Sequence, residues 1–136
     1  MAVNDIIPKY IVGVACIIKN MEKLLILKRS PKLRIAPGVW EVVAGKVEIG
    51  EQPEETIKRE ITEETNLTVK LEAIPLSIIQ TTLESQPMIL IYYKGCYISG
   101  DLKLSDEHTD GMWVDAESFV ELSEYKHLNN LILNRI

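Results

Sequence analysis

Three glutamates between positions 60 and 64 are the side chains whose spacing is best suited to chemistry: Glu60, Glu63 and Glu64. Successive residues of an α-helix are offset by about 100°, so these three positions fall within an arc of about 100° on one side of a helix. Ile57 and Ile61 lie beside that arc and are predicted to face the core. The carboxylates would then follow one edge of the helix, next to its buried stripe.

The clustering of these carboxylates has two interpretations. Like charges three and four residues apart destabilise a helix, so the cluster is costly if it only faces solvent. Clustered carboxylate oxygens suit a hard cation such as Mg²⁺ or Mn²⁺. A solvated charged face is the common alternative, and the spacing alone leaves it open.

The helix that carries the glutamates is predicted to run from Pro53 to about Thr65. Proline is favoured at the first helical position, and Glu54 and Glu55 suit the positive end of the helix dipole. Asn66 follows the last helical residue, where a left-handed residue commonly ends a helix. The sequence therefore supplies both ends of this helix.

The segment from Gly45 to Leu67 resembles the box of the Nudix hydrolases. That box reads Gly, five residues, Glu, seven residues, and then Arg-Glu-aliphatic-x-Glu-Glu-x-Gly-aliphatic. The matching positions are Gly45, Glu51, Arg59, Glu60, Ile61, Glu63, Glu64 and Leu67. The departure is Asn66 in place of the second glycine, and it is a mild one because Asn also adopts the left-handed conformation.

The resemblance extends over residues 10 to about 122. LLILKRS resembles the family's aliphatic strand that ends in basic residues, and residues 38–41 match its Gly-x-Trp strand. Residues 107–115 (EHTDGMWVD) resemble its acidic loop before a Trp strand and terminal helix. The Pro-Gly-Gly that often precedes the box lysine is here Val-Ala-Gly, at residues 43–45.

The resemblance implies a divalent-metal-dependent pyrophosphohydrolase that cleaves a diphosphate linkage in nucleoside triphosphates or other nucleoside diphosphate derivatives. The implied cofactor is Mg²⁺ or Mn²⁺, and the implied ligands are the Gly45 carbonyl, Glu60, Glu63 and Glu64. Arg59 would orient the carboxylates through a bidentate pair. Glu51 would hold the loop against the helix, which is a structural role.

The general base has two candidates, Glu60 and Glu107, and Glu107 is equally compatible with a plain surface residue. Phosphate-binding cations are expected from the basic stretch before the Trp strand, where we favour Arg29 and Arg34. An isolated arginine in a loop is often only solvated, which is the alternative for both.

The substrate is left open by the sequence. Neither the proline typical of ADP-ribose hydrolases nor the tyrosine typical of dinucleoside polyphosphate hydrolases stands at its usual distance after the box. A compact single domain resembles the nucleoside-triphosphate-cleaving members most. A hydrolase of ADP-ribose or another nucleotide sugar is the alternative. A catalytically silent nucleotide-binding Nudix domain is less favoured, because every box carboxylate is present.

Hydrophobic periodicity predicts a mixed β-sheet flanked by helices (α/β, α+β), and the resemblance implies that these form the α/β/α sandwich of the Nudix type. Residues 11–18 are apolar on both alternate faces, as in a central strand covered on two sides. The other expected β segments are residues 24–28, 39–45, 68–83 with a break near Pro75, 88–98 and 112–114. Further helices are expected from Asp115 to Leu122 and in the tail, whose apolar stripe is Leu128, Leu131, Ile132 and Ile136.

Length and composition limit the class of protein. A chain of 136 residues is expected to form one domain, 1–136. The net charge of −5 argues against binding a nucleic-acid polymer, whose partners are basic. It allows an anionic substrate, provided that a divalent cation mediates the contact. The partner that the resemblance implies is a small-molecule nucleotide, and a homodimer is left open.

The apolar runs and cysteines indicate where the protein resides. The run from Ile11 to Ile18 is far shorter than the 20 or so apolar residues that span a bilayer, so no membrane partner is expected. Cys16 and Cys96 each lie within an apolar run and are expected to be buried thiols of a reducing, cytoplasmic compartment.

Overall fold

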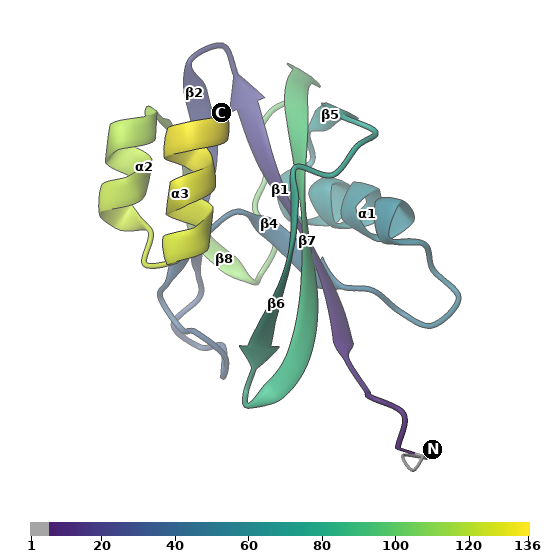
Figure 1. Ribbon diagram of the computed structural model, residues 1–136. Helices are drawn as coiled ribbons and strands as arrows, with labels where there is room; N and C mark the ends of the chain where they lie inside the picture. The colour runs from purple at the N-terminus through teal and green to yellow at the C-terminus, as the bar shows by residue number, and fades with distance from the viewer. Residues whose placement is uncertain (1–5) are drawn as a thin grey trace.

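The computed structural model describes residues 6–136, so the first five residues of the expected domain 1–136 lie outside the described part of the chain. Within that part, eight strands form one mixed sheet with helices on both of its faces (Figure 1). The expected α/β/α sandwich is therefore confirmed.

The strands are β1 (Ile11–Asn20), β2 (Lys23–Arg29), β3 (Trp40–Glu41), β4 (Val43–Lys46), β5 (Thr68–Leu71), β6 (Ser77–Leu83), β7 (Gln86–Ser99) and β8 (His108–Val114). The helices are α1 (Pro53–Thr65), α2 (Ala116–Leu122) and α3 (Lys126–Arg135). None of these helices is both long and apolar enough to cross a membrane.

Strand β1 is the centre of the sheet. It runs parallel to β7 from Ile11, opposite Met88, to Lys19, opposite Cys96. On its other side it pairs antiparallel with β4 and, at its end, with β2. Strands β5 and β6 both pair with β7, while β3 and β8 pair with β2. A strand with neighbours on both sides and helices on both faces is apolar at consecutive positions, which explains its sequence.

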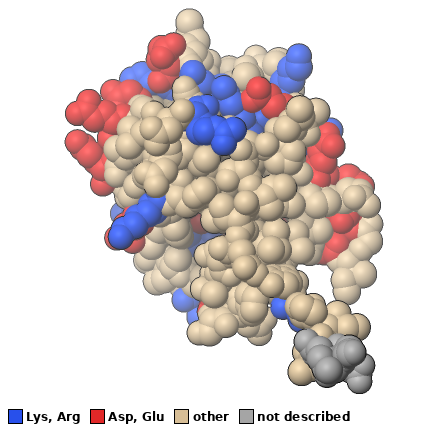
Figure 2. Space-filling model, viewed as in Figure 1, with Lys and Arg blue, Asp and Glu red and all other residues tan. Residues whose placement is uncertain are grey.

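Two apolar cores lie on the two faces of the sheet. One contains Val14 and Cys16 of β1 with Ile57 and Ile61 of α1. The other contains Ala15, Ile17 and Phe119 with the α3 stripe, Leu128, Leu131 and Ile132. Figure 2 shows acidic side chains over the flanks formed by α1 and α2, with an uncharged band between them over β6 and β7. The sheet thus separates a helix that carries carboxylates from a pair of helices that covers the opposite core.

Three details differ from the expectations. The strand expected at 39–45 is two short strands interrupted at Val42, and the strand expected at 112–114 begins at His108. Cys16 is buried as expected, but Cys96 is exposed, so the expectation of a second buried thiol is wrong. Strand alternation places Cys96 on the same face of β7 as Tyr92, the α2–α3 face. Cys96 lies beyond the part of that face that belongs to the core.

Helix α1 has the expected bounds, and its end is the left-handed residue that the sequence indicated. Asn66 has φ 64° and ψ 12°, and its backbone N–H donates to the Thr62 carbonyl. Its side chain also donates to the Asp101 carbonyl at 3.3 Å. This cap ends the helix two residues after Glu64.

Replacing Asn66 tests the cap. Asn66→Val should lower the free energy of unfolding by about 1–2 kcal/mol, because a Cβ-branched residue is strained at positive φ. Asn66→Gly should change it little, since relief of the Cβ strain is offset by about 0.4–1 kcal/mol of added unfolded-chain entropy. Urea unfolding of both variants measures the difference, and equal stabilities would contradict the left-handed cap.

Candidate active site

The packing of α1 on the sheet decides how far each box glutamate is buried. Ile57 and Ile61 are 0% and 3% exposed, and burial of each stabilises the fold by about 1.5–3 kcal/mol relative to exposure. This contact fixes the rotation of the helix. Glu64 is then 2% exposed, whereas the side chain of Glu63 is 56% exposed. The three glutamates therefore cross from the core edge to solvent.

Arg59 connects the loop before α1 to the helix carboxylates. Its guanidinium binds Glu51 in a bidentate pair, with Nε to Oε2 at 3.0 Å and Nη2 to Oε1 at 3.1 Å. Its Nη1 donates to Glu60 Oε1 at 3.0 Å and to Glu63 Oε2 at 3.3 Å. The hydrogen bonds from Arg59 and then Thr56 lower the pKa of Glu51 to about 2. Arg59 and Glu51 are thus in position for the orienting and structural roles that the resemblance implied.

Gly45 lies on β4 directly against Glu60. A Cβ at position 45 would lie 2.6 Å from both Cγ and Cδ of Glu60, which is closer than real Cβ contacts. Glycine at this position lets the Glu60 side chain pass over the strand backbone. A larger residue at position 45 would therefore force the Glu60 side chain to shift.

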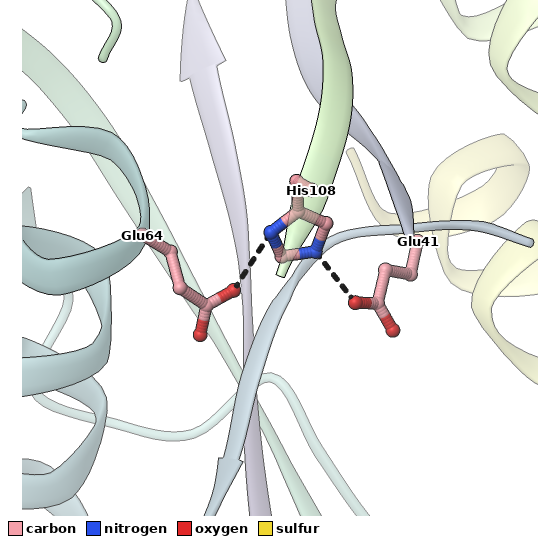
Figure 3. A group of neighbouring side chains, drawn as sticks. All are labelled: Glu41, Glu64 and His108. Carbon is pink, nitrogen blue, oxygen red and sulfur yellow. Dashed lines mark hydrogen bonds and ion pairs between the residues drawn. The ribbon is translucent and has the colours of Figure 1, made fainter. Parts of the chain in front are cut away.

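Two side chains from the sheet, His108 and Glu41, lie near Glu64 (Figure 3). The imidazole of His108, from the start of β8, lies between the carboxylates of Glu64 and Glu41. His108 Nε2 is 2.8 Å from Glu41 Oε2, and His108 Nδ1 is 3.8 Å from Glu64 Oε1. Ligand atoms of all three lie within 4.8 Å of one another.

A β-bulge directs His108 toward this group. Asp110 pairs with Lys28, yet His108 pairs with the next residue, Arg29, so Thr109 is an extra residue in β8. A one-residue shift moves the following side chain to the other face of a sheet. Met112 and Val114 belong to the α2–α3 core, whereas His108 faces α1 and Glu64.

The carboxylate of Glu64 lacks the partners that a buried charge needs. In the described part of the chain, both of its oxygens and His108 Nδ1 are buried without a hydrogen-bond partner. Burial, followed by the neighbouring Glu60 carboxylate, raises the pKa of Glu64 to about 10. A buried carboxylate requires a proton or a cation, and this donor set of oxygen and nitrogen atoms fits a divalent metal ion.

The two expected arginines lie in different surroundings. Arg29 donates from Nη1 to Glu41 Oε2 at 3.1 Å and from Nε to the Ile35 carbonyl at 3.0 Å. Arg34 is 74% exposed and forms an ion pair with Glu84 in the turn between β6 and β7. Arg29 is therefore joined to the carboxylate group, and Arg34 is not.

A cavity of about 390 Å³ lies between the sheet and the start of α3. Its wall is mainly apolar and belongs to the α2–α3 face, with Leu90 and Tyr92 among its residues. His127, which also lines it, packs on Tyr92 with ring centroids 5.6 Å apart. Arg29, Glu41 and Gly45 are part of the same lining, so the cavity extends to the carboxylate group.

Glu107 is exposed and immediately precedes His108. Its main-chain oxygen accepts a hydrogen bond from the Ser30 N–H at 2.8 Å. Its charge is one of those that raise the pKa of Glu64, which places its carboxylate near the buried one. Either role considered for it, a general base or a surface residue, is compatible with this position.

Sequence reasoning missed Glu41 and His108 as site residues, although both stand within segments matched to the family. Glu41 is a single charged residue in the otherwise apolar run VWEVV, and that is a signal that could have found it. Nothing in the sequence indicates the bulge at Thr109, without which strand alternation would turn His108 away.

Comparison with known proteins shows the family and the fold. Residues 9–133 match the NUDIX domain. The crystal structure of the MutT protein from Methanosarcina mazei Go1 has a TM-score of 0.81 and 28% identity, covering 95% of this chain and 94% of that one. Nucleoside triphosphatase NudI from Enterobacter sp. (strain 638) is 28% identical over 128 residues, which are 87% of this chain and 84% of that protein.

A longer relative shares only one region with this chain. Octanoyltransferase from Myxococcus xanthus is 28% identical over 114 residues, which are 81% of this chain but 31% of that protein. The chain thus spans less than a third of the length of that relative. The similarity concerns a region, and not the whole of the longer protein.

Replacing Gly45 tests its contact with Glu60. Gly45→Ala should displace the Glu60 carboxylate and lower Mg²⁺ affinity by about 10-fold or more, since misplaced site residues typically cost 10–100-fold. Gly111→Ala is the control on β8, where the new Cβ would meet the ends of three leucine side chains at 2.9–3.1 Å and no proposed ligand. Titration calorimetry with MgCl₂ measures both variants, and equal affinities would show that the contact does not position Glu60.

The pH dependence of stability tests the burial of Glu64. Because its folded pKa is about 10 and its ordinary value is 4.5, the metal-free folded state holds a proton that the unfolded state releases between these values. Its contribution to stability therefore falls as pH rises through this window. At pH 8, metal-free Glu64→Gln should melt about 4 °C or more above the wild type, with a flatter pH profile.

Glu63→Gln, at the exposed position, is the control for this measurement. It removes the same charge from the same helix without removing the buried carboxylate. A pH profile of Tm that is equally steep in the wild type and in Glu64→Gln would contradict the assignment.

Proposed function

The chain belongs to the NUDIX family, and from that premise we propose that it is a divalent-metal-dependent hydrolase of the diphosphate linkage in nucleoside triphosphates or other nucleoside diphosphate derivatives. The observation that carries the proposal is the buried Glu64 carboxylate, whose two oxygens lack protein partners beside Glu60 and near the end of a cavity. No hydrogen-bond partner for these two oxygens lies within residues 6–136, and a divalent cation would fill that role.

The metal ligands that we propose are the Gly45 carbonyl, Glu60, Glu63 and Glu64, with Mg²⁺ or Mn²⁺ as the ion. A bound divalent cation neutralises phosphate oxygens and lowers the pKa of coordinated water. Arg59 orients the carboxylates, because one guanidinium contacts both Glu60 and Glu63 while Glu51 holds it in a bidentate pair. Glu51 in turn holds the loop to the helix.

Of the two candidates for the general base, we favour Glu107. Oε1 of Glu60 already accepts a hydrogen bond from Arg59, whereas the Glu107 residue is exposed at the edge of the carboxylate group. An exposed carboxylate at this edge can take a proton from an attacking water. Glu60 then serves as a ligand and not as the base.

The phosphates and the nucleoside use different parts of the cavity in this proposal. Arg29 stands where the cavity meets the carboxylates, and Arg34 supplies charge from outside the cavity lining. About 390 Å³ of mainly apolar space is within the range of small-molecule sites and suits a nucleoside. Tyr92 and His127 offer ring surfaces to it.

Nucleoside triphosphates are the substrate class that we favour. The nucleoside triphosphatase from Enterobacter matches this chain over 84% of its own length, so the two proteins have similar extents. A hydrolase of ADP-ribose or another nucleotide sugar is the second candidate. A silent nucleotide-binding domain is disfavoured by the complete set of box carboxylates. Residues 1–136 would act as one domain on a small nucleotide, with no nucleic-acid polymer or membrane as a partner.

A nucleotide panel tests this function. With Mg²⁺ or Mn²⁺, the protein should hydrolyse nucleoside triphosphates faster than ADP-ribose, UDP-glucose or a dinucleoside polyphosphate, with products identified by ³¹P NMR. Glu64→Gln should lower kcat by about 100-fold or more, since it removes the buried ligand on which metal catalysis depends. Glu121→Gln, which removes an exposed carboxylate from α2, is the control and should keep full activity.

Other outcomes of the panel would replace the proposal. Faster cleavage of ADP-ribose or UDP-glucose would favour the nucleotide-sugar alternative. Nucleotide binding with no hydrolysis under either metal would favour the silent domain.

A further inference from the structure

We propose that His108 is a nitrogen ligand of the divalent cation, binding it through Nδ1 together with Glu64, and that Glu41 holds the imidazole for this role. The inference deepens the proposed metal site and rests on that proposed function. It is argued from the geometry of Glu41, Glu64 and His108, of which only Glu64 belongs to the box. It adds to the carboxylates of α1 a ligand from the start of β8.

The distance between the two proposed ligand atoms suits a shared metal ion. His108 Nδ1 and Glu64 Oε1 are 3.8 Å apart, which is too long for a hydrogen bond. Metal–ligand bonds of about 2.0–2.2 Å span this separation at a ligand–metal–ligand angle of about 120–145°. Neighbouring ligands of an octahedral ion subtend about 90°, so the two side chains would move together by about 1 Å on binding. Both atoms are buried, and neither has a hydrogen-bond partner among the described residues.

The opposite nitrogen of the ring is held as in known metal sites. His108 Nε2 lies 2.8 Å from Glu41 Oε2, so its N–H donates to that carboxylate and Nδ1 keeps its lone pair. Histidine ligands usually donate their second N–H to a carboxylate in this way, which fixes tautomer and ring orientation. Arg29 binds the same Glu41 carboxylate at 3.1 Å and orients it.

A doubly protonated His108 that bridges two carboxylates is the competing arrangement. It would need an acceptor for the Nδ1 proton, and the ion-pair distance from Nδ1 to Glu64 is 3.8 Å. Both Glu64 oxygens would also stay without a hydrogen bond in a site from which water is largely excluded. A cation bound by Nδ1 and by both Glu64 oxygens would satisfy all three buried atoms at once, whereas the ion pair leaves them without a hydrogen bond.

A nitrogen ligand changes which metals the site prefers. Mg²⁺ is bound chiefly by oxygen atoms, whereas imidazole suits the transition metals. The site should therefore bind Mn²⁺ more tightly than Mg²⁺, and this preference should decrease in His108→Gln.

Pulsed EPR of bound Mn²⁺ tests the ligand directly, without substrate and without activity as the readout. The untagged protein is loaded with MnCl₂ in a nitrogen-free buffer, once at natural abundance and once with ¹⁵N-labelled histidine. We expect nitrogen modulation that changes from ¹⁴N to ¹⁵N on labelling. His127→Gln should keep the signal, which assigns it to His108 without any change to a buried side chain.

Three results would overturn the proposal: bound Mn²⁺ without histidine modulation, no Mn²⁺ binding, or loss of the signal in His127→Gln. Failure of the proposed hydrolysis is a separate result, because a histidine-ligated Mn²⁺ in a protein inactive on every nucleotide would leave the ligation intact. Conversely, hydrolysis with an all-oxygen ion would keep the function and exclude His108.

The role of Glu41 is tested by a matched pair of charge-neutralising variants. Glu41→Gln should weaken Mn²⁺ binding by about 10-fold or more, as loss of a histidine's carboxylate partner does in other sites. Glu121→Gln removes one exposed carboxylate from α2, which carries none of the proposed ligands, and should leave the affinity unchanged. Calorimetric titration with MnCl₂ measures both, and equal affinities would contradict the positioning role of Glu41.

Discussion

The burial of one carboxylate, that of Glu64, is the constraint on which the rest of the site depends. Ile57 and Ile61 pack α1 against the sheet, and the same contact places Glu64 at the seam between the helix and the strands. Desolvation there disfavours the charged form of the group. Each nearby residue has one of three effects: it adds negative charge near Glu64, it neutralises part of that charge, or it places a metal-binding atom beside it.

Arg59 partly neutralises the carboxylates on the solvent side of α1. One guanidinium contacts Glu51, Glu60 and Glu63, so the like-charged residues of α1 are held by a common partner at their solvent side. Glu64 faces the other way and does not share that partner. The outer edge of the helix is therefore partly neutralised, by one guanidinium against three carboxylates. The buried inner edge lacks that guanidinium, and it is where a cation has the most to contribute.

The extent to which the sequence predicted the molecule follows from the range of each interaction. The bounds of α1 and its end at Asn66 depend on local chemistry, and both were predictable. The central position of β1 was predictable because two covered faces leave an apolar run. Glu41 and His108 come from segments far apart in the chain, and a bulge at Thr109 decides where His108 points. Cys96 was misjudged because an apolar run does not tell where the covering helices stop.

The alternation of side chains along the segment from Trp40 to Gly45 has a consequence for how proteins of this kind diverge. All four of Glu41, Val42, Ala44 and Gly45 line the cavity. Val42 and Ala44 also pack in the α2–α3 core, whereas Glu41 contacts His108 and Gly45 lies against Glu60. Neighbouring residues of one short segment therefore contribute to different features, one pair to the carboxylate group and the other to the packing behind the cavity wall. A substitution at Val42 or Ala44 can reshape that wall while Glu41 and Gly45 keep their contacts, so the two features can diverge separately.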